Sequence, residues 1–305
     1  MPDLNSTLPL RQLGRYLREW RTQAGYSLDR AGELLESSGS ALQRIEKGQK
    51  AKLKKKEVGE ICDLYQMPDD LKEAMIGLAQ QAANKSGWWH SYGDLIANGF
   101  DVYMGLEAAA HHLSTYQGEL IPGLFQTPEY DLALIVQKWP DSTEAERDRR
   151  VQIKQRRQHI LHRKSMPTKY DAVISEAALH RVAGNGLVMA AQCRRLADLS
   201  TMDNISLRIL PFGAGFPDGT AMPPFVAIDF GTDSKTGVPL EPPLVFLEGV
   251  VGSMYLEKQS DIELFLESYQ LIRATALTET ASRDLVRHIA KEHEKRGLRT
   301  GQRIG

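Results

Sequence analysis

Residues 37–56, SSGSALQRIEKGQKAKLKKK, combine side chains that can contact a nucleic acid. Gln43 can form hydrogen bonds with an adenine edge, and Arg44 can bind a guanine edge or a phosphate. Three small residues at the start of the stretch can offer helix N-terminal amides to a phosphate, namely Ser38, Gly39 and Ser40. The lysines that follow suit phosphate contacts, which position a protein on DNA without reading its sequence: Lys47, Lys50, Lys52, Lys54, Lys55 and Lys56.

The charge of this part of the chain differs from that of the whole. The 305-residue chain has a formal net charge of -1, whereas residues 11–56 contain 12 Lys or Arg against 5 Asp or Glu. A local positive excess of this kind suits a phosphate backbone. The alternative is that the lysine run is an ordinary solvated helix start. We expect Glu46 to pair with an arginine of the first helix, because phosphates would repel a carboxylate that faced them.

Helical periodicity places these residues in a set of short helices. The string LRQLGRYLREWRTQAG has apolar side chains at spacings of three and four, which is typical of a helix that ends at Gly25. Ser27 caps a second helix, and Ser38 or Ser40 caps a third that ends at Gly48. Two short helices joined by a tight turn form a helix-turn-helix, whose second helix can lie in the major groove. The second helix is expected to bury Ala31, Leu34 and Leu35.

The string LREWRTQAGYSLDRAGELLESSGSALQRIEKG resembles the lambda-repressor-like (Xre) family of helix-turn-helix proteins. The residues that fall on the family's pattern are Arg18, Arg21, Gly25, Ser27, Ala31, Ser38, Ser40, Leu42, Ile45, Glu46 and Gly48. The resemblance covers about residues 10–66 and implies an all-α domain that binds double-stranded DNA, which we place at residues 1–85. One such domain covers one half-site, so we expect a homodimer on a two-fold site.

The pattern changes near residue 86, where the string NKSGWWHSYGDLIANGF interrupts the helices. The following stretch mixes helical strings with strand-like strings such as KYDAVIS, ISLRIL, PFVAIDF and PLVFLEG. Strand-like strings outnumber obvious crossover helices in residues 205–257. We therefore predict an α+β domain with a largely antiparallel sheet at residues 86–295, followed by a disordered tail at residues 296–305.

A second resemblance begins at the string YMGLEAAAHHLSTYQGELIPGLFQTPEYDLALI. It is similar to the opening of an uncharacterised C-terminal domain that follows the Xre module in many actinomycete regulators. Later strings continue the likeness, among them VISEAALHR, ISLRILPFGAGFP and LVFLEG, so that it spans about residues 100–285. The resemblance implies regulation of transcription, often beside small partner proteins encoded nearby. It does not imply a particular ligand.

The segment YQGELIPGLFQTPEY concentrates hydrogen-bonding side chains around a tight turn and a helix start, where backbone amides are unpaired. Pro122 and Gly123 suit the middle of a type II turn, and Thr127 caps the helix that follows. Glu176 and Glu248 each end a strand-like string, where sites often gather. A ligand site here would use Tyr116, Glu119, Gln126, Thr127, Tyr130, Glu176 and Glu248.

Two alternatives to this ligand site are open. In the first, the same residues are structural, and Glu119 pairs with an arginine such as Arg157 or Arg181. In the second, a buried glutamate acts as a general base, and the domain is a nucleotide- or NAD-directed enzyme fused to a DNA-binding domain. The chain contains no Walker loop, no GxSxG string and no HExxH string, so we expect that it is not an enzyme.

Cysteine usage and hydropathy limit the remaining classes. Cys62 and Cys193 are far apart and show no CxxC spacing, so neither a disulfide framework nor a zinc site is expected, and a reducing cytoplasm fits. No apolar run approaches the length of a membrane span, and the first residues lack a signal-peptide pattern. We expect a cytoplasmic protein without metal or cofactor. Its expected partners are DNA, a second copy of the chain, and a small-molecule ligand or small partner protein.

Overall fold

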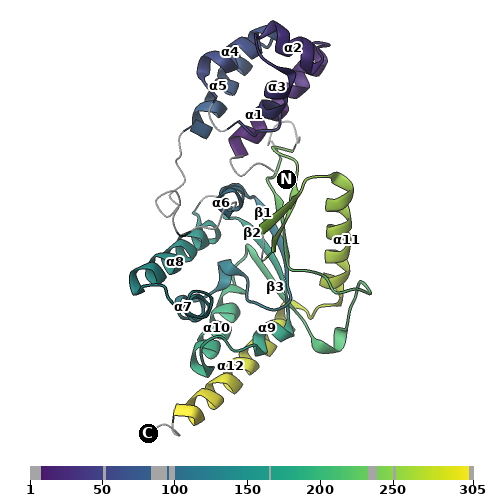
Figure 1. The fold of residues 1–305 in the computed structure, drawn as a ribbon. Helices are drawn as coiled ribbons and strands as arrows, with labels where there is room; N and C mark the ends of the chain where they lie inside the picture. Colours follow the sequence, from purple (N-terminus) through teal and green to yellow (C-terminus); the bar gives the residue numbers. More distant parts are fainter. Residues whose placement is uncertain are drawn as a thin grey trace. The chain divides into compact units, whose positions relative to one another are not determined.

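The computed structural model of the chain describes residues 8–50, 53–83, 95, 100–164, 166–232, 239–249 and 252–301. The chain forms two compact units, residues 1–109 and 110–305, which are drawn as ribbons in Figure 1. The junction predicted near residue 86 lies outside the described residues.

The described part of the first unit is helical. Its helices are α1 (Leu8–Gln23), α2 (Leu28–Leu34), α3 (Gly39–Glu46), α4 (Lys55–Leu64), α5 (Asp69–Ala83) and α6 (Phe100–Ala109). Amphipathic helices bury their apolar sides against one another, and here the shared core contains Leu10, Leu13, Leu17, Ala31, Leu42, Ile45, Val58, Ile61, Cys62, Tyr65 and Met75. The all-helical prediction for the N-terminal region is confirmed.

Local hydrogen bonds start the two central helices. The Ser27 hydroxyl accepts from the backbone amide of Arg30 at 3.1 Å and caps α2. The Ser38 hydroxyl accepts from the amide of Ala41 at 3.1 Å and caps α3. The predicted cap at Ser27 is confirmed, and of the two residues proposed for the third helix it is Ser38 that caps. Such a cap supplies a partner to an amide that the helix itself leaves unpaired.

One predicted core position is wrong. Leu34 is exposed, whereas Ala31 is buried and Leu35 packs half-buried against the core. Ala31 and Leu35 are four residues apart and share one side of α2. Leu34 is rotated by about 100° from Leu35 around the helix axis, so it lies at the margin of that side.

The second unit is organised around one six-stranded sheet with the order β3-β2-β1-β4-β5-β6. Its strands are β1 (His112–Gln117), β2 (Lys169–Ser175), β3 (Ile205–Leu210), β4 (Phe225–Asp229), β5 (Leu244–Gly249) and β6 (Gly252–Leu256). β1 and β2 are parallel, as are β2 and β3. The pairs β1–β4, β4–β5 and β5–β6 are antiparallel.

The sheet is therefore mixed, and the prediction of a largely antiparallel sheet is wrong. The antiparallel strands β4 to β6 do follow one another without a helix between them in the described residues. The parallel strands lie earlier in the chain, and helices separate them: α7 (Pro128–Lys138) and α8 (Glu144–Arg157) before β2, then α9 (Glu176–His180) and α10 (Gly186–Leu199) before β3. Parallel neighbours need crossovers of this kind.

Helices cover both faces of the sheet, with α11 (Gln259–Thr275) on one side and α7, α8 and α10 on the other (Figure 1). Alternate residues of β2 face these two layers. Val173 packs in the core that includes Tyr269 and Ile272 of α11. Tyr170 faces the other layer, where its ring meets Phe125 edge-on, with 4.8 Å between ring centroids. Short 3-10 helices lie in the connections: η2 (Gly123–Phe125), η3 (Gln158–His162) and η4 (Phe212–Ala214).

The last helix, α12 (Glu279–Gly301), continues past residue 296, where the sequence suggested a disordered tail. Close packing against α10 holds it there. A Cβ atom on Gly186 would lie 2.8 Å from the backbone nitrogen of Gly297, so the two helices touch through glycines. Residues 302–305 lie outside the described residues. Within the described part of the chain, no helix is both long enough and apolar enough to cross a bilayer.

Candidate nucleic-acid interface and the polar sites of the second unit

The α2–α3 pair forms a helix-turn-helix. α2 ends at Leu34, α3 starts at Gly39, and the amide of Ser37 closes the turn by donating to the Gly32 carbonyl at 2.8 Å. A Cβ atom on Gly32 would lie 2.8 Å from the nitrogen of Gly39. Gly32 therefore lets the two helices approach closely.

α3 has one buried side and one exposed side. The buried residues are Leu42, Ile45 and Glu46. At the start of the helix Ser38 is exposed and Gly39 is half-buried. The exposed residues include both side chains that were predicted to read bases, and they are Ser40, Gln43, Arg44 and Lys47.

Glu46 attaches α3 to α1. Its carboxylate accepts from Arg21 through two hydrogen bonds, Nε to Oε1 at 2.6 Å and Nη2 to Oε2 at 3.0 Å, and Arg18 donates to the Glu46 carbonyl at 3.1 Å. These bonds confirm the predicted pairing with an arginine of the first helix. The hydrogen bond to Glu46 raises the pKa of Arg21, against the opposing effect of burial. Gly14 leaves room for this contact, since a Cβ atom there would lie 2.6 Å from the Glu46 carbonyl oxygen.

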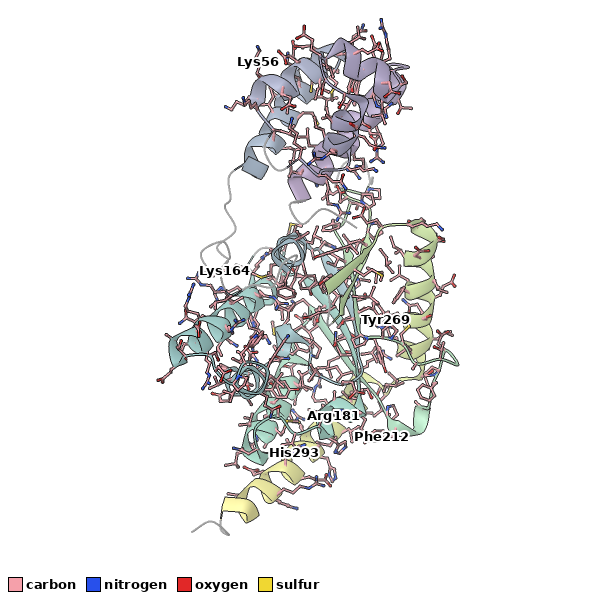
Figure 2. All side chains as sticks on the ribbon, in the orientation of Figure 1. Lys56, Lys164, Arg181, Phe212, Tyr269 and His293 are labelled. Carbon is pink, nitrogen blue, oxygen red and sulfur yellow. The ribbon has the colours of Figure 1, made fainter. Side chains whose placement is uncertain are left out.

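The lysine run leads into α4. Lys54 is the N-cap of that helix, Lys55 and Lys56 are its first two residues, and all three are exposed. Figure 2 labels Lys56 on the outside of the first unit. Positive side chains at a helix N-terminus oppose the helix dipole, so helix stability does not explain their position. Lys52 lies outside the described residues.

Two of the predicted phosphate-binding lysines have acidic neighbours. Lys50 pairs with Glu57, and the Lys56 ammonium lies 3.6 Å from Glu60. Exposed pairs of this kind contribute little, about 0–1 kcal/mol, so a phosphate can displace them. Lys47 is exposed directly after α3.

In the second unit, the polar side chains between β1 and α7 form hydrogen bonds with neighbouring groups of the same unit. Gln126 is buried; its amide donates to the Ile121 carbonyl at 2.7 Å, and its oxygen accepts from Lys154 at 2.6 Å. Thr127 caps α7 by accepting from the Tyr130 amide at 3.3 Å, which confirms the predicted cap. Tyr130 is buried as well, and its hydroxyl accepts from the Ile121 amide at 3.4 Å.

The predicted type II turn at Pro122 and Gly123 is wrong. A type II turn needs a positive φ at its third residue, but Gly123 has none and instead begins η2. The Phe125 amide donates to the Pro122 carbonyl at 2.8 Å and closes the 3-10 turn. The side chain of Gln158 donates to the Gln126 carbonyl at 2.7 Å and holds the end of η2 in place.

Lys154 of α8 joins this segment to a buried carboxylate. Its ammonium donates to Asp131 Oδ1 at 2.5 Å. Burial lowers the pKa of Lys154 by more than the charge and hydrogen bond of Asp131 raise it, and the charge of Glu248 acts in the same direction as Asp131. Of the predicted ligand residues, Gln126 contacts this lysine directly. The second carboxylate oxygen, Asp131 Oδ2, is buried without a hydrogen-bond partner among the described residues.

The carboxyl ends of the parallel strands hold two more of the predicted residues. Glu119, after β1, pairs with Arg181. This arginine is one of the two that were predicted as partners of Glu119 if its role is structural. Glu176, after β2, accepts from the amide of Phe212 at 2.9 Å and lies 3.5 Å from His180. Figure 2 shows Arg181 and Phe212 at the same end of the second unit.

The seven predicted ligand residues therefore occupy three places. Gln126, Thr127 and Tyr130 lie at the start of α7, and Glu119, Glu176 and Glu248 lie at the carboxyl ends of β1, β2 and β5, which run in the same direction. Tyr116 packs half-buried against the core beneath α11, where burial and the charge of Glu119 raise its pKa. A ligand site made from these residues stays a prediction.

Comparison with known families gives two matches. Residues 12–75 match the family described as a helix-turn-helix domain. Residues 100–288 match the family described as a domain of unknown function (DUF5753). The chain belongs to the DUF5753 family. No curated protein and no solved structure matches the chain. The closer resemblance to Xre regulators of actinomycetes stays a prediction.

The DUF5753 domain contains a cavity of about 500 Å³ that the sequence analysis missed. It opens at the amino ends of β1, β2 and β3, opposite to the ends that hold Glu119 and Glu176, and none of the seven predicted ligand residues lines it. Its lining includes charged groups of both signs from two strands and α12: His112, Lys169, Asp171, Glu279 and Arg283. The one signal in the sequence was Asp171, a charged residue inside the strand-like string KYDAVIS.

The charges in this cavity are fixed by neighbours from several elements. Burial would raise the pKa of Asp171, but the hydrogen bond and charge of His112, followed by the charge of Arg273, lower it below its ordinary value. The Ser206 hydroxyl donates to Glu279 at 2.7 Å. In the part of the chain that the structure describes, no three His, Cys, Asp or Glu side chains gather as a metal site.

Proposed function

We propose that the chain is a sequence-specific DNA-binding regulator of transcription, and that α3 reads base edges in the major groove. The observation that carries this proposal is the exposure of Gln43 and Arg44 on a helix whose other side is attached to α1 through Glu46. A short helix that is held rigidly can present two side chains to base edges in a fixed geometry. The helix-turn-helix family match supports the same conclusion.

The lysines at the start of α4 supply phosphate contacts. Lys54, Lys55 and Lys56 occupy a helix N-terminus, where each positive charge costs about 0.3–1 kcal/mol of helix stability. A DNA phosphate near this position would compensate the repulsion, because it brings negative charge to the same helix end. In this arrangement α3 reads the bases, and the three lysines position the protein on the DNA backbone.

The bound form is a homodimer. One reader helix gives too little discrimination against the many competing sites of a genome, whereas two copies read two half-sites about 34 Å apart.

The DUF5753 domain supplies the regulatory response. Its cavity of about 500 Å³ lies within the usual size range of small-molecule sites, and its charged lining suits a small polar ligand. A ligand or a partner protein that binds this domain alters DNA binding, and no catalytic step is required. Turnover of NAD or of a nucleoside phosphate by the purified chain, abolished in Glu176→Gln, would instead support the enzyme alternative.

The test uses the full chain and duplexes selected from a random library. Arg44→Ala and Gln43→Ala are each expected to weaken binding to the selected duplex by about 1–3 kcal/mol, with little change on random DNA. Gln23→Ala, at an exposed position at the end of α1, is the matched control. Equal losses on selected and random DNA would contradict base reading.

The role of the lysines in phosphate binding is tested with the triple change of Lys54, Lys55 and Lys56 to Gln. Affinity should fall on all sequences, and the dependence of binding on salt should flatten by up to about 0.9 for each phosphate that the variant no longer neutralises. Lys72→Gln, which removes one cation from α5, is the control. An unchanged salt slope in the triple variant would remove these lysines from the interface.

A further inference from the structure

Exposed apolar side chains gather at the carboxyl end of the parallel strands. Phe212 and Phe216 follow β3 and are 63% and 70% exposed. Val182 follows α9 and Leu120 follows β1, and both are exposed as well. We call these four residues the apical patch. Contiguous apolar surface on a soluble protein marks a contact with another molecule more often than single exposed residues do.

Contacts between the neighbouring connections bring the segments that carry Phe212, Val182 and Leu120 together, and Phe216 follows Phe212 in the chain. The amide of Phe212 donates to Glu176 at 2.9 Å, and its ring stacks on His180 with 5.8 Å between ring centroids. His180 precedes Arg181 in the chain, and Arg181 pairs with Glu119, which precedes Leu120. The exposed aromatic ring is therefore held outward by a defined set of contacts. Figure 2 shows Phe212 and Arg181 together at this end of the domain.

The charges beside the apical patch have opposite signs. The side chains of Glu119 and Arg181 are 59% and 64% exposed, and each adjoins a residue of the patch in the chain. A two-fold contact brings the same surface of two copies together. In such a contact, Arg181 of each copy can meet Glu119 of the other, while the apolar side chains form the dry centre. The net charge of -1 gives little repulsion between copies.

We propose that the apical patch is the surface through which two copies of the chain form a two-fold dimer. This inference rests on the proposed function, because a helix-turn-helix regulator that reads two half-sites needs two copies. A second copy fits better than a small molecule, because the patch is formed by protruding side chains, and the cavity of the domain lies at the opposite strand ends.

The first test measures the mass of the full chain in solution by light scattering and analytical ultracentrifugation. The wild-type chain should have twice the monomer mass of 34.1 kDa. Replacing both Phe212 and Phe216 with Ser should weaken the dimer by about 30-fold or more, the effect of removing central interface anchors. Met254→Ser removes a residue that is 56% exposed on β6, and it should leave the dimer intact. A monomeric wild-type chain, or a dimer that the Phe variant does not weaken, would overturn the proposal.

The second test separates a contact between copies from a contact within one copy. Arg181→Glu alone and Glu119→Arg alone should each dimerise poorly, because each places like charges across the two-fold axis. An equimolar mixture of the two variants should form a heterodimer, in which every cross-axis pair is again of opposite sign. If Glu119 and Arg181 interact only within one copy, mixing the two variants cannot restore association. Failure of the mixture to associate therefore counts against the apical patch as the dimer surface.

DNA binding provides an independent readout. Binding of each variant to a single half-site, measured by fluorescence anisotropy, should match the wild type, while binding to a two-fold site should weaken. A chain that binds half-sites but never dimerises would contradict the proposed dimer surface without contradicting the DNA-binding function. A chain that dimerises through the patch but binds no duplex would contradict the proposed function instead.

Discussion

Each unit of this DUF5753 protein contains an ion pair with a buried carboxylate, and the two pairs are built differently. In the first unit the carboxylate of Glu46 is 2% exposed, and both of its oxygens accept from the Arg21 guanidinium. In the second unit the carboxylate of Asp131 is also 2% exposed, but Lys154 reaches only one oxygen, and Oδ2 has no partner among the described residues. The planar fork of an arginine matches a carboxylate in a way that a single ammonium cannot.

The pKa shifts of the two cations run in opposite directions. The hydrogen bond to Glu46 raises the pKa of Arg21 in spite of burial, whereas burial lowers the pKa of Lys154 in spite of Asp131. Arginine stays protonated in proteins, while a buried lysine can release its proton. The first pair therefore cannot relax if its carboxylate is removed, and the second can. Changes at Glu46, Asp131 and Lys154 test this difference.

The largest expected effect is that of Glu46→Gln. This change leaves the guanidinium of Arg21, whose side chain is only 12% exposed, charged and without its carboxylate, which should destabilise the first unit by about 3 kcal/mol. It should also weaken DNA binding, since α3 loses its attachment to α1. Urea unfolding of the full chain, followed by far-ultraviolet circular dichroism, measures the loss. Glu33→Gln is the matched control, because it breaks an exposed pair with Arg30 and should cost no more than about 1 kcal/mol.

A smaller effect is expected for Asp131→Ala. Without its carboxylate partner, Lys154 can become neutral and keep its hydrogen bond to Gln126, so the loss should be about 1–3 kcal/mol, the cost of one imperfectly paired buried group. The double variant Asp131→Ala with Lys154→Met should recover only part of that loss, because it removes the buried amine but leaves the Gln126 oxygen without its donor. A single-variant loss as large as that of Glu46→Gln would contradict the comparison.

The smallest effect is a dependence on pH. Because the pKa of Lys154 is lowered on folding, the unfolded chain binds more protons than the folded one between the lowered pKa and the ordinary value of 10.5. The stability of the wild type relative to Lys154→Met should therefore rise as the pH increases from neutral towards 10.5, with a slope below about 1.4 kcal/mol per pH unit. Urea unfolding of both proteins across this range measures the difference. A flat or falling difference would show that burial does not dominate at Lys154.

The two units also differ in how much of their structure could be predicted from the sequence. In the first unit the decisive signals are local. Ser27 caps α2 and Ser38 caps α3, while Gly25 follows the end of α1 and Gly48 follows the end of α3, each with a positive φ. The Arg21–Glu46 pair was predictable in kind, because a carboxylate on a reader helix must turn away from phosphates. In the second unit a local signal predicted the helix cap at Thr127 correctly. The local signal failed at Gly123, where the Gln158 side chain, from a distant part of the chain, donates to the carbonyls of Gly123 and Gln126.

By itself, the sequence determined the helix-turn-helix, the cap at Ser27 and the exposure of Gln43 and Arg44, because these follow from hydrogen bonds and periodicity within a few residues. Only the tertiary structure decided that β1, β2 and β3 are parallel. Their pairing joins segments separated by pairs of helices, and no local pattern encodes which strands become neighbours. The cavity at one end of these strands and the apical patch at the other are consequences of that pairing. Neither could therefore be predicted from the sequence alone.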